Sequence, residues 1–122
     1  MDHLVFVYGT LRRGCVNHGL LRVPDARLLG PGRTEKLYAL YLDADGTPYV
    51  KEEEPRVRIR GELYRVTPPV LAALDALEEH PSDYERRETA VILDNGPRHR
   101  AWLYFHPAPP GRLLPGGDFL NV

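Results

Sequence analysis

The stretch LVFVYGTLRRG, residues 4–14, joins a short apolar run to a glycine-bearing loop. Its first five residues are apolar, β-branched or aromatic and stop at Gly9, which predicts a buried strand. The loop exposes backbone N–H groups beside two arginines, and such loops can bind an anion, a carboxylate or a phosphate. Gly9 and Gly14 have the spacing of a nucleoside-triphosphate loop, but Cys-Val at 15–16 replaces the required Lys-Ser or Lys-Thr. We therefore expect a strand that ends in an anion-binding turn and binds no nucleoside triphosphate.

Later segments add strands with short turns between them. Residues 57–64 alternate apolar and polar side chains at period two, which predicts a half-buried strand, and Gly61 within it suggests a bulge or close packing. Glu62 lies on the outward face of this strand, where a cross-strand ion pair is its expected role. Asn95-Gly96 supplies the positive φ angles of a tight turn. The other expected elements are strands at 36–42, 89–93 and 101–105, a short helical turn at 15–22, and a helix that Thr67 caps, that starts at Pro68 and that ends near His80.

Strands outnumber helices in this pattern, and short turns join consecutive strands. We therefore expect one α+β domain over residues 1–122, with a compact, mixed but largely antiparallel, barrel-like sheet and a few short helices.

Composition narrows the classes of function. The formal net charge of -1 shows no broad electrostatic footprint for nucleic acid or acidic lipid. Cys15 is the single cysteine, so neither an intrachain disulfide nor a multi-cysteine metal site is expected, and the histidines are scattered without metal-ligand spacing. The first 14 residues lack the basic start and long apolar run of a signal peptide, and no apolar segment of about 20 residues occurs, so we expect neither a signal peptide nor a membrane span. We expect a cytoplasmic protein without a cofactor, a metal, a nucleic-acid partner or a membrane partner. The oligomeric state does not follow from the sequence.

The helix after Thr67 places one carboxylate on its apolar face. At about 100° per residue, four apolar residues form a buried stripe: Val70, Leu71, Leu74 and Leu77. Glu78 falls inside that stripe, whereas Asp75 and Glu79 fall toward water. Burial raises a carboxyl pKa, which makes Glu78 a candidate general acid and base near neutral pH. An alternative remains open, in which the frayed end of the helix lets the Glu78 side chain bend outward or pair with an arginine.

Several motifs occur together in a recognisable order. They are Val5-Phe6-Val7-Tyr8-Gly9-Thr10-Leu11-Arg12 with Gly14, Asn17-His18 and Leu20-Leu21, then Gly61-Glu62-Leu63-Tyr64, Leu74-Asp75-Ala76-Leu77-Glu78 ahead of Pro81, Tyr84 with Arg86, and finally Trp102, Tyr104 and Gly117-Asp118-Phe119. With these motifs the chain resembles the γ-glutamylcyclotransferase-like family over nearly its whole length, particularly the γ-glutamylamine cyclotransferase (AIG2-like) branch and small bacterial members.

The resemblance implies a barrel-like α+β fold with a cavity. The family's catalytic glutamate matches Glu78, and the loop Tyr8, Gly9, Thr10 and Leu11 would hold the γ-glutamyl part of a small substrate, largely through backbone groups. Tyr84 is expected to line the cavity as a further substrate-binding residue. The chain departs from the family at Glu79-His80, where small or glycine residues are common, and in the acidic region 47–55, which puts the leaving group of the substrate in doubt.

The implied reaction is release of 5-oxo-L-proline from an L-γ-glutamyl amine or γ-glutamyl amino acid. The α-amine attacks the γ-carbonyl of the same molecule, with Glu78 as general base and acid and with no metal or nucleotide. Two alternatives stay open. One is a pocket protein that binds a small amino-acid-like or acidic ligand without turnover, and the other is an enzyme that acts on a γ-glutamyl-capped biosynthetic intermediate.

Overall fold

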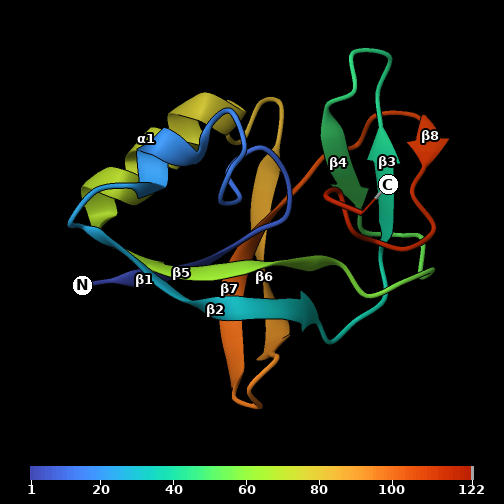
Figure 1. Ribbon diagram of the computed structural model, residues 1–122. Coiled ribbons are helices and arrows are strands. Elements are labelled where there is room, and N and C mark those ends of the chain that lie inside the picture. The colour runs from blue at the N-terminus through green and yellow to red at the C-terminus, as the bar shows by residue number, and fades with distance from the viewer. Residues whose placement is uncertain (122) are drawn as a thin grey trace.

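A computed structural model describes residues 1–121 of the chain (Figure 1). Within these residues the chain forms eight strands, one α-helix and one 3-10 helix. In order they are β1 (His3–Val7), η1 (His18–Leu21), β2 (Ala26–Thr34), β3 (Ala39–Leu42), β4 (Pro48–Lys51), β5 (Arg60–Val66), α1 (Pro68–Glu78), β6 (Glu85–Leu93), β7 (Arg98–Phe105) and β8 (Arg112–Leu113). No helix among them is long and apolar enough to span a membrane.

The sheet curls into a five-stranded barrel with an extension. Its strand order is β1-β5-β2-β6-β7-β4-β3-β8, and an additional pairing of β1 with β7 closes the first five strands. The closing pair is parallel, with Val5 opposite Trp102, and β4 also joins β7 in parallel, with Val50 opposite Phe105. All other ladders are antiparallel. The expected α+β fold with a mixed, largely antiparallel, barrel-like sheet is confirmed, and β3, β4 and β8 lie beside the barrel on the side away from α1 (Figure 1).

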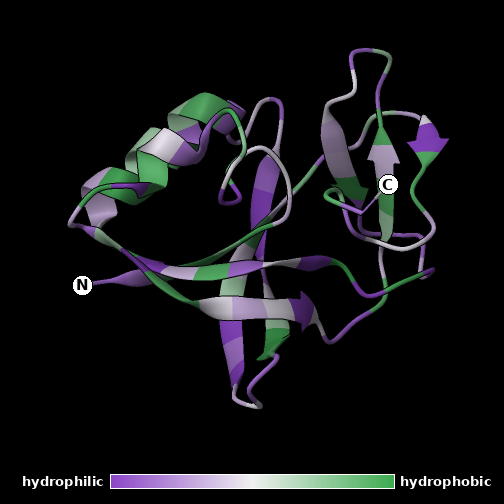
Figure 2. Ribbon diagram, in the orientation of Figure 1, coloured by the Kyte–Doolittle hydropathy of each residue, from purple (hydrophilic) through white to green (hydrophobic). Residues whose placement is uncertain are grey.

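Two apolar cores lie on opposite faces of the barrel wall. The interior core includes Phe6, Leu40 and Leu63, all fully buried. The second core lies between the outer face of the wall and the helices α1 and η1, and it contains Tyr64 and Leu74. Hydrophobic and hydrophilic residues accordingly alternate along α1 (Figure 2). Because α1 covers the second face of β5, both faces of that strand are buried along part of its length.

Three local expectations need correction. The strand β2 was not expected, since Pro31-Gly32 favours a turn by composition, yet these residues pair with β5. Thr67 occupies the N-cap position of α1, but its hydroxyl makes no capping bond. In the turn between β6 and β7 only Gly96 has a positive φ angle, and Asn95 does not. The prediction of close packing at Gly61 is confirmed, because a Cβ there would lie 2.4 Å from the carbonyl oxygen of Val7.

Helix α1 ends at an unusual residue. Glu79 forms its C-cap with φ 54° and ψ 44°, and it is the one non-glycine residue with positive φ among those described. This left-handed conformation brings the Cβ of an L-residue close to its own backbone, so glycine is favoured there. The expected family pattern of a small residue after Glu78 thus has a conformational reason.

Replacing Glu79 by glycine is expected to stabilise the fold by about 0.5–1 kcal/mol, because the left-handed strain is relieved. Urea denaturation of both proteins measures the difference. Glu53→Gly is the matched control, since Glu53 is also exposed but has no positive φ angle, and it is expected to be neutral or destabilising. A destabilised Glu79→Gly variant would show that the strain is negligible.

Candidate active site

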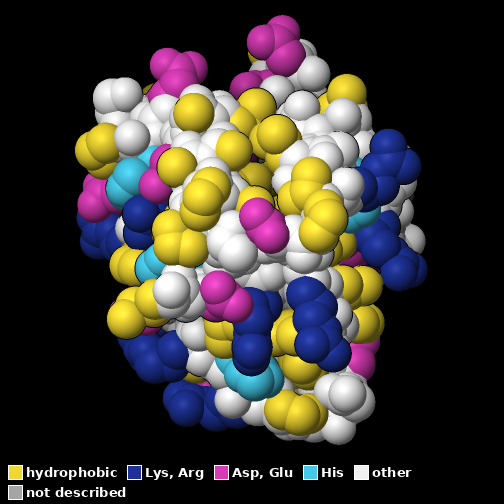
Figure 3. Space-filling view, turned by 90° about the vertical axis from the view of Figure 1, so that its left-hand side faces the viewer, with side chains coloured by type: hydrophobic (Ala, Val, Ile, Leu, Met, Phe, Trp, Pro, Cys, Tyr) yellow, Lys and Arg dark blue, Asp and Glu magenta, His cyan; other side chains and the backbone are white. Residues whose placement is uncertain are grey.

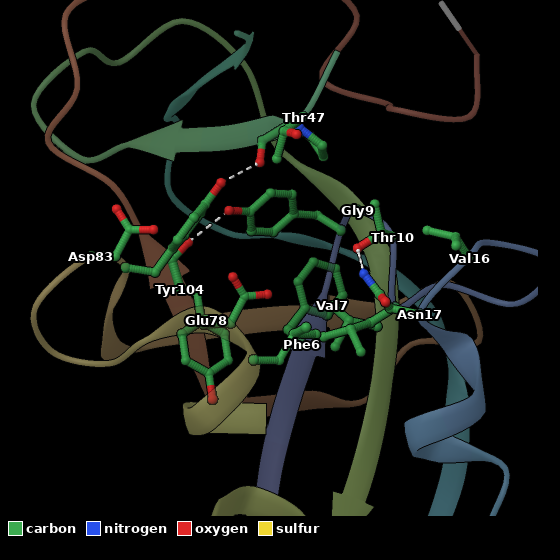
Figure 4. A pocket seen from close by; sticks show the side chains of 15 residues that line it. Phe6, Val7, Gly9, Thr10, Val16, Asn17, Thr47, Glu78, Asp83 and Tyr104 are labelled. Atoms are coloured by element: carbon green, nitrogen blue, oxygen red, sulfur yellow. Dashed lines mark hydrogen bonds between the residues drawn. The ribbon is translucent and has the colours of Figure 1, made fainter. Parts of the chain in front are cut away.

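A cavity of about 370 Å³ opens at one end of the barrel, between the loop after β1 and the C-terminal end of α1 (Figure 4). It is lined by Phe6, Val7, Tyr8, Gly9, Thr10, Leu11, Val16, Asn17, Thr47, Pro48, Leu77, Glu78, Asp83, Tyr84 and Tyr104. All six residues singled out from the sequence, namely Glu78, Tyr8, Gly9, Thr10, Leu11 and Tyr84, are in this set. Segments from both halves of the chain therefore meet at one cavity.

The loop after β1 forms one wall of the cavity. It turns sharply, with the N–H of Arg12 donating to the carbonyl of Gly9 at 3.0 Å, and Asn17 ties it down by two bonds to Thr10, each 2.9 Å long. Gly9 is required by packing, because a Cβ there would lie 2.7 Å from Cγ of Pro48. Within residues 1–121, no acceptor pairs with the backbone N–H groups of Gly9, Thr10 or Leu11. The loop thus offers unpaired donors beside the cavity.

Arg12 anchors this loop to the C-terminal segment. Its side chain is only 9% exposed, and its Nη1 donates to Oδ1 of Asp118 at 2.7 Å. Glu62 lies on its other side, with Oε2 at 3.7 Å from Nε of Arg12. The expectation of a solvent-facing Glu62 is wrong: the residue is 9% exposed, and its Oε1 accepts bonds from the N–H of Arg13 and the hydroxyl of Tyr64. The outward face of β5 is covered here, so the charge pairs with a buried loop arginine.

Glu78 is the last residue of α1, and its carboxyl group points into the cavity (Figure 4). The prediction of an inward side chain is confirmed. Burial raises its pKa from 4.5 to about 7, and the nearby negative charge of Asp83 adds to the effect. Leu77 differs from expectation, since it is 39% exposed and rims the cavity instead of joining the core. Glu78 therefore holds or releases a proton near neutral pH.

The rim of the cavity is apolar on the side of the helices. Val16 is 85% exposed and Leu77 is 39% exposed, although both line the cavity. Hydrophobic side chains gather on the upper part of the molecular face that carries α1 (Figure 3). A ligand larger than the cavity would therefore meet apolar side chains as it leaves the mouth.

Tyrosine side chains brace the cavity. Tyr8 donates its hydroxyl to the carbonyl of Tyr104 at 2.9 Å, and Tyr84 donates to the carbonyl of Pro48 at 2.9 Å. Burial, together with the charge of Glu78, raises the pKa of both Tyr8 and Tyr84 well above the ordinary value, so both hydroxyls remain protonated donors. Because these bonds are made to the backbone, the rings are held as fixed walls.

Asp75 departs from the sequence expectation of a solvent-facing carboxylate. Its two oxygens accept bonds from Nε and Nη2 of Arg86 at 2.8 and 3.0 Å, and Oδ1 also accepts the hydroxyl of Tyr104 at 2.6 Å. Burial alone would raise the Asp75 pKa, but the bonds from Arg86 and Tyr104 hold it below its ordinary value. The sequence prediction missed these partners because a helical wheel describes one helix alone, whereas Arg86 lies on β6 and Tyr104 lies on β7.

Asp83 separates the main cavity from a smaller one of about 130 Å³. Its Oδ1 lies 2.6 Å from Nε2 of His106, whose Nδ1 accepts the N–H of Ala108, so Nε2 carries the proton and donates to Asp83. Of the acidic region 47–55, Thr47 and Pro48 line the main cavity, whereas Glu52 and Glu53 line the smaller one. The glutamates of that region therefore do not face Glu78. Among the described residues, no three His, Cys, Asp or Glu side chains cluster as a metal site.

The raised pKa of Glu78 has a consequence for stability. Between about pH 4.5 and pH 7 the folded protein keeps a proton that the unfolded chain releases, so stability falls as pH rises through this window. We expect the contribution of Glu78 to the free energy of unfolding to drop by about 2 kcal/mol from pH 5 to pH 8. Glu78→Gln, which carries no charge at either pH, should lose this drop.

Urea denaturation at the two pH values measures this difference. Glu79→Gln is the matched control, because Glu79 is the adjacent, exposed carboxylate, and it should keep the pH dependence of the unchanged protein. An identical pH dependence in Glu78→Gln and the unchanged protein would mean that the Glu78 carboxyl is solvated.

Fold and cavity together define a closed barrel with a cavity at one end. The chain belongs to the family described as gamma-glutamyl cyclotransferase, AIG2-like, whose family model matches residues 5–121. The Methanocaldococcus jannaschii protein named "Putative gamma-glutamylcyclotransferase MJ1514" is 42% identical over 115 residues, which are 94% of this chain and 93% of that protein.

Two mammalian relatives extend the comparison. The human gamma-glutamylaminecyclotransferase is 38% identical over 95 residues, 74% of this chain and 62% of that protein. The crystal structure of a mouse AIG2-like protein superposes with a TM-score of 0.81 at 28% identity, covering 88% of this chain and 80% of that one. The predicted family is thus confirmed from both sequence and fold.

Proposed function

We propose that this protein is a cyclotransferase that releases 5-oxo-L-proline from an L-γ-glutamyl amine or γ-glutamyl amino acid, with Glu78 as the catalytic acid and base. One observation carries the proposal: the Glu78 carboxyl, with a pKa of about 7, faces the cavity that Gly9, Thr10 and Leu11 also line, and the backbone N–H groups of these three residues have no acceptor among residues 1–121. A proton carrier with a pKa near the working pH is suited to moving protons in both directions.

The charges of the cavity suggest how the substrate is oriented. Among the described lining residues the charged side chains are Glu78 and Asp83, both acidic, and no Lys, Arg or His side chain lines the cavity. The α-carboxylate or the developing oxyanion of a γ-glutamyl group would therefore bind to backbone N–H groups of the loop. The α-ammonium group would lie on the opposite side, near the carboxylates, where Glu78 can take its proton.

Glu78 makes two proton transfers in this chemistry, and no covalent enzyme intermediate forms. Glu78 as carboxylate removes a proton from the α-ammonium group, and the free amine attacks the γ-carbonyl carbon, forming the C–N bond of a five-membered ring. The original amide C–N bond breaks as protonated Glu78 gives its proton to the departing nitrogen, and the ring nitrogen passes its one extra proton to the released amine, which leaves a neutral lactam and a protonated amine. Holding the folded substrate conformer can supply several kcal/mol, since intramolecular attack avoids a bimolecular encounter, and the acid–base transfer adds about 10²–10⁴-fold.

The test is incubation of the purified protein with γ-glutamyl amines, γ-glutamyl dipeptides and glutathione, followed by quantification of 5-oxoproline. The panel should include large leaving groups such as a γ-glutamyl-capped biosynthetic amine, because the apolar rim at Val16 and Leu77 can contact them. Release from at least one compound is expected. Ligand binding across the panel without any turnover would overturn the proposal and favour a non-catalytic pocket protein.

A further inference from the structure

Glu78 sits where a helix ordinarily loosens. It is the last residue of α1, and the chain leaves the helix immediately through the left-handed Glu79. The last carbonyl groups of a helix lack partners within the helix, and here the carbonyls of Asp75 and Glu78 accept the N–H groups of His80 and Tyr84, which lie outside it. A catalytic side chain at this position therefore needs fixing by groups outside the helix.

Asp75 supplies that fixing one turn earlier on the same helix. Arg86 of β6 binds both of its carboxylate oxygens, and the Arg86 guanidinium also stacks on the ring of Trp102 at 4.4 Å. A planar guanidinium group that is already stacked on an aromatic ring loses little conformational freedom when it binds a carboxylate, so the Arg86–Asp75 pair is rigid. The backbone N–H of Arg86 further donates to Nδ1 of His80, which ties down the segment after Glu78.

Tyr104 joins this pair to the cavity. Its hydroxyl donates to Asp75 at 2.6 Å, its ring lines the cavity beside Glu78, and its carbonyl accepts the hydroxyl of Tyr8 (Figure 4). One residue thus connects the catalytic helix to the first residue of the substrate loop. The distance between α1 and the loop therefore depends on the hydrogen bond from Tyr104 to Asp75, the hydrogen bond from Tyr8 to Tyr104 and the Tyr104 ring between them.

We propose that Asp75, Arg86 and Tyr104 act as a positioning unit, which holds the carboxyl group of Glu78 inside the cavity at a set distance from the substrate loop. This inference rests on the proposed function of Glu78 as proton carrier. Asp75 and Arg86 do not line the cavity, so they act through the helix and Tyr104 and not on the substrate. Misplacement of a reacting group by about 1 Å can cost about 100-fold in rate.

The main test compares Tyr104→Phe and Asp75→Asn with the unchanged protein, well below their unfolding temperatures. We expect kcat to fall by about 10- to 100-fold while KM changes less than about threefold, because the loop that binds substrate is retained. The double variant should lose no more than the worse single variant, since both act through one unit. Arg86→Lys should behave like Asp75→Asn, because lysine keeps the charge but not the fork.

A second readout does not depend on turnover. The carboxyl pKa of Glu78, followed by ¹³C NMR and assigned by its loss in Glu78→Gln, should fall from about 7 toward its ordinary 4.5 in Tyr104→Phe as the group becomes solvated. If no γ-glutamyl compound is turned over at all, this shift still tests the positioning unit separately from the proposed function.

Glu35→Gln is the matched control. It breaks another two-bond arginine–carboxylate pair, with Arg98, at the opposite end of β7 from Tyr104. It should leave both kcat and the Glu78 pKa unchanged. Variants of the unit that lower stability but keep kcat and the Glu78 pKa would overturn the inference and reduce the unit to a structural ion pair.

Discussion

Glu78→Gln is expected to lower kcat for 5-oxoproline release by about 10²–10⁴-fold, with little change in substrate binding. Glutamine preserves the shape of the side chain and its ability to form hydrogen bonds, but it cannot carry a proton between the ammonium group and the leaving nitrogen. Steady-state kinetics with a substrate that the unchanged protein turns over gives kcat, and equilibrium binding of the same compound to the variant shows that the cavity is intact.

Glu79→Gln is the control for this substitution. Glu79 follows Glu78 directly, yet it is exposed and absent from the cavity wall, so its variant should keep the full rate. Equal turnover by Glu78→Gln and Glu79→Gln would remove Glu78 from the mechanism.

Asp118→Asn is expected to destabilise the protein by about 3 kcal/mol, because it leaves the guanidinium of Arg12 buried without its nearest counter-charge. The side chains of Arg12 and Asp118 are 9% and 22% exposed and lie 2.7 Å apart. Glu62 remains as a weaker partner, with its Oε2 at 3.7 Å from Nε of Arg12. The expected loss is therefore near the lower end of the about 3–5 kcal/mol that breaking a buried ion pair costs. Urea denaturation of both proteins at one pH measures the loss.

The protein contains a control pair with the same shortest distance, held by two hydrogen bonds at a more exposed position. Arg60 and Asp94 also lie 2.7 Å apart, but their side chains are 32% and 41% exposed. Asp94→Asn should therefore cost only about 0–1 kcal/mol, since water screens this pair. Equal losses for the two variants would show that burial does not decide the strength of the Arg12–Asp118 contact.

The position of Glu78 was predictable because helix geometry is local. The period of 3.6 residues places it between Leu71 and Leu74 whatever packs against the helix, and the buried Leu71 and Leu74 confirm that face. The strand at the start of the chain was predictable for a similar reason, since a short run of apolar, β-branched and aromatic residues that stops at glycine is typical of a buried strand. The motif order then identified the family.

The partners of charged side chains were not predictable from the same patterns. Asp75 looks solvated on a wheel, and Glu62 looks solvated on an alternating strand, but each meets an arginine from elsewhere in the chain. Arg86 lies 11 residues from Asp75, and Arg12 lies 50 residues from Glu62 and 106 residues from Asp118. Only the closed barrel, with helices over one of its faces, brings these groups together.

The strand β2 shows a different failure. Its Pro31-Gly32 pair favours a turn by local propensity, but the pairing with β5 and β6 overrides that preference. Gly32 fits because a Cβ there would lie 2.5 Å from the carbonyl oxygen of Ile92, so close backbone approach explains the glycine. Tertiary contact, which no short window of sequence contains, decides this element.

The most direct test of the account is a ¹³C NMR titration of the Glu78 carboxyl, with and without a γ-glutamyl compound that the protein binds. We predict a single glutamate resonance, absent in Glu78→Gln, that titrates near pH 7 in the free protein and shifts when the ligand is added. A Glu78 carboxyl that titrates near 4.5 and does not respond to the ligand would contradict its placement in the substrate cavity.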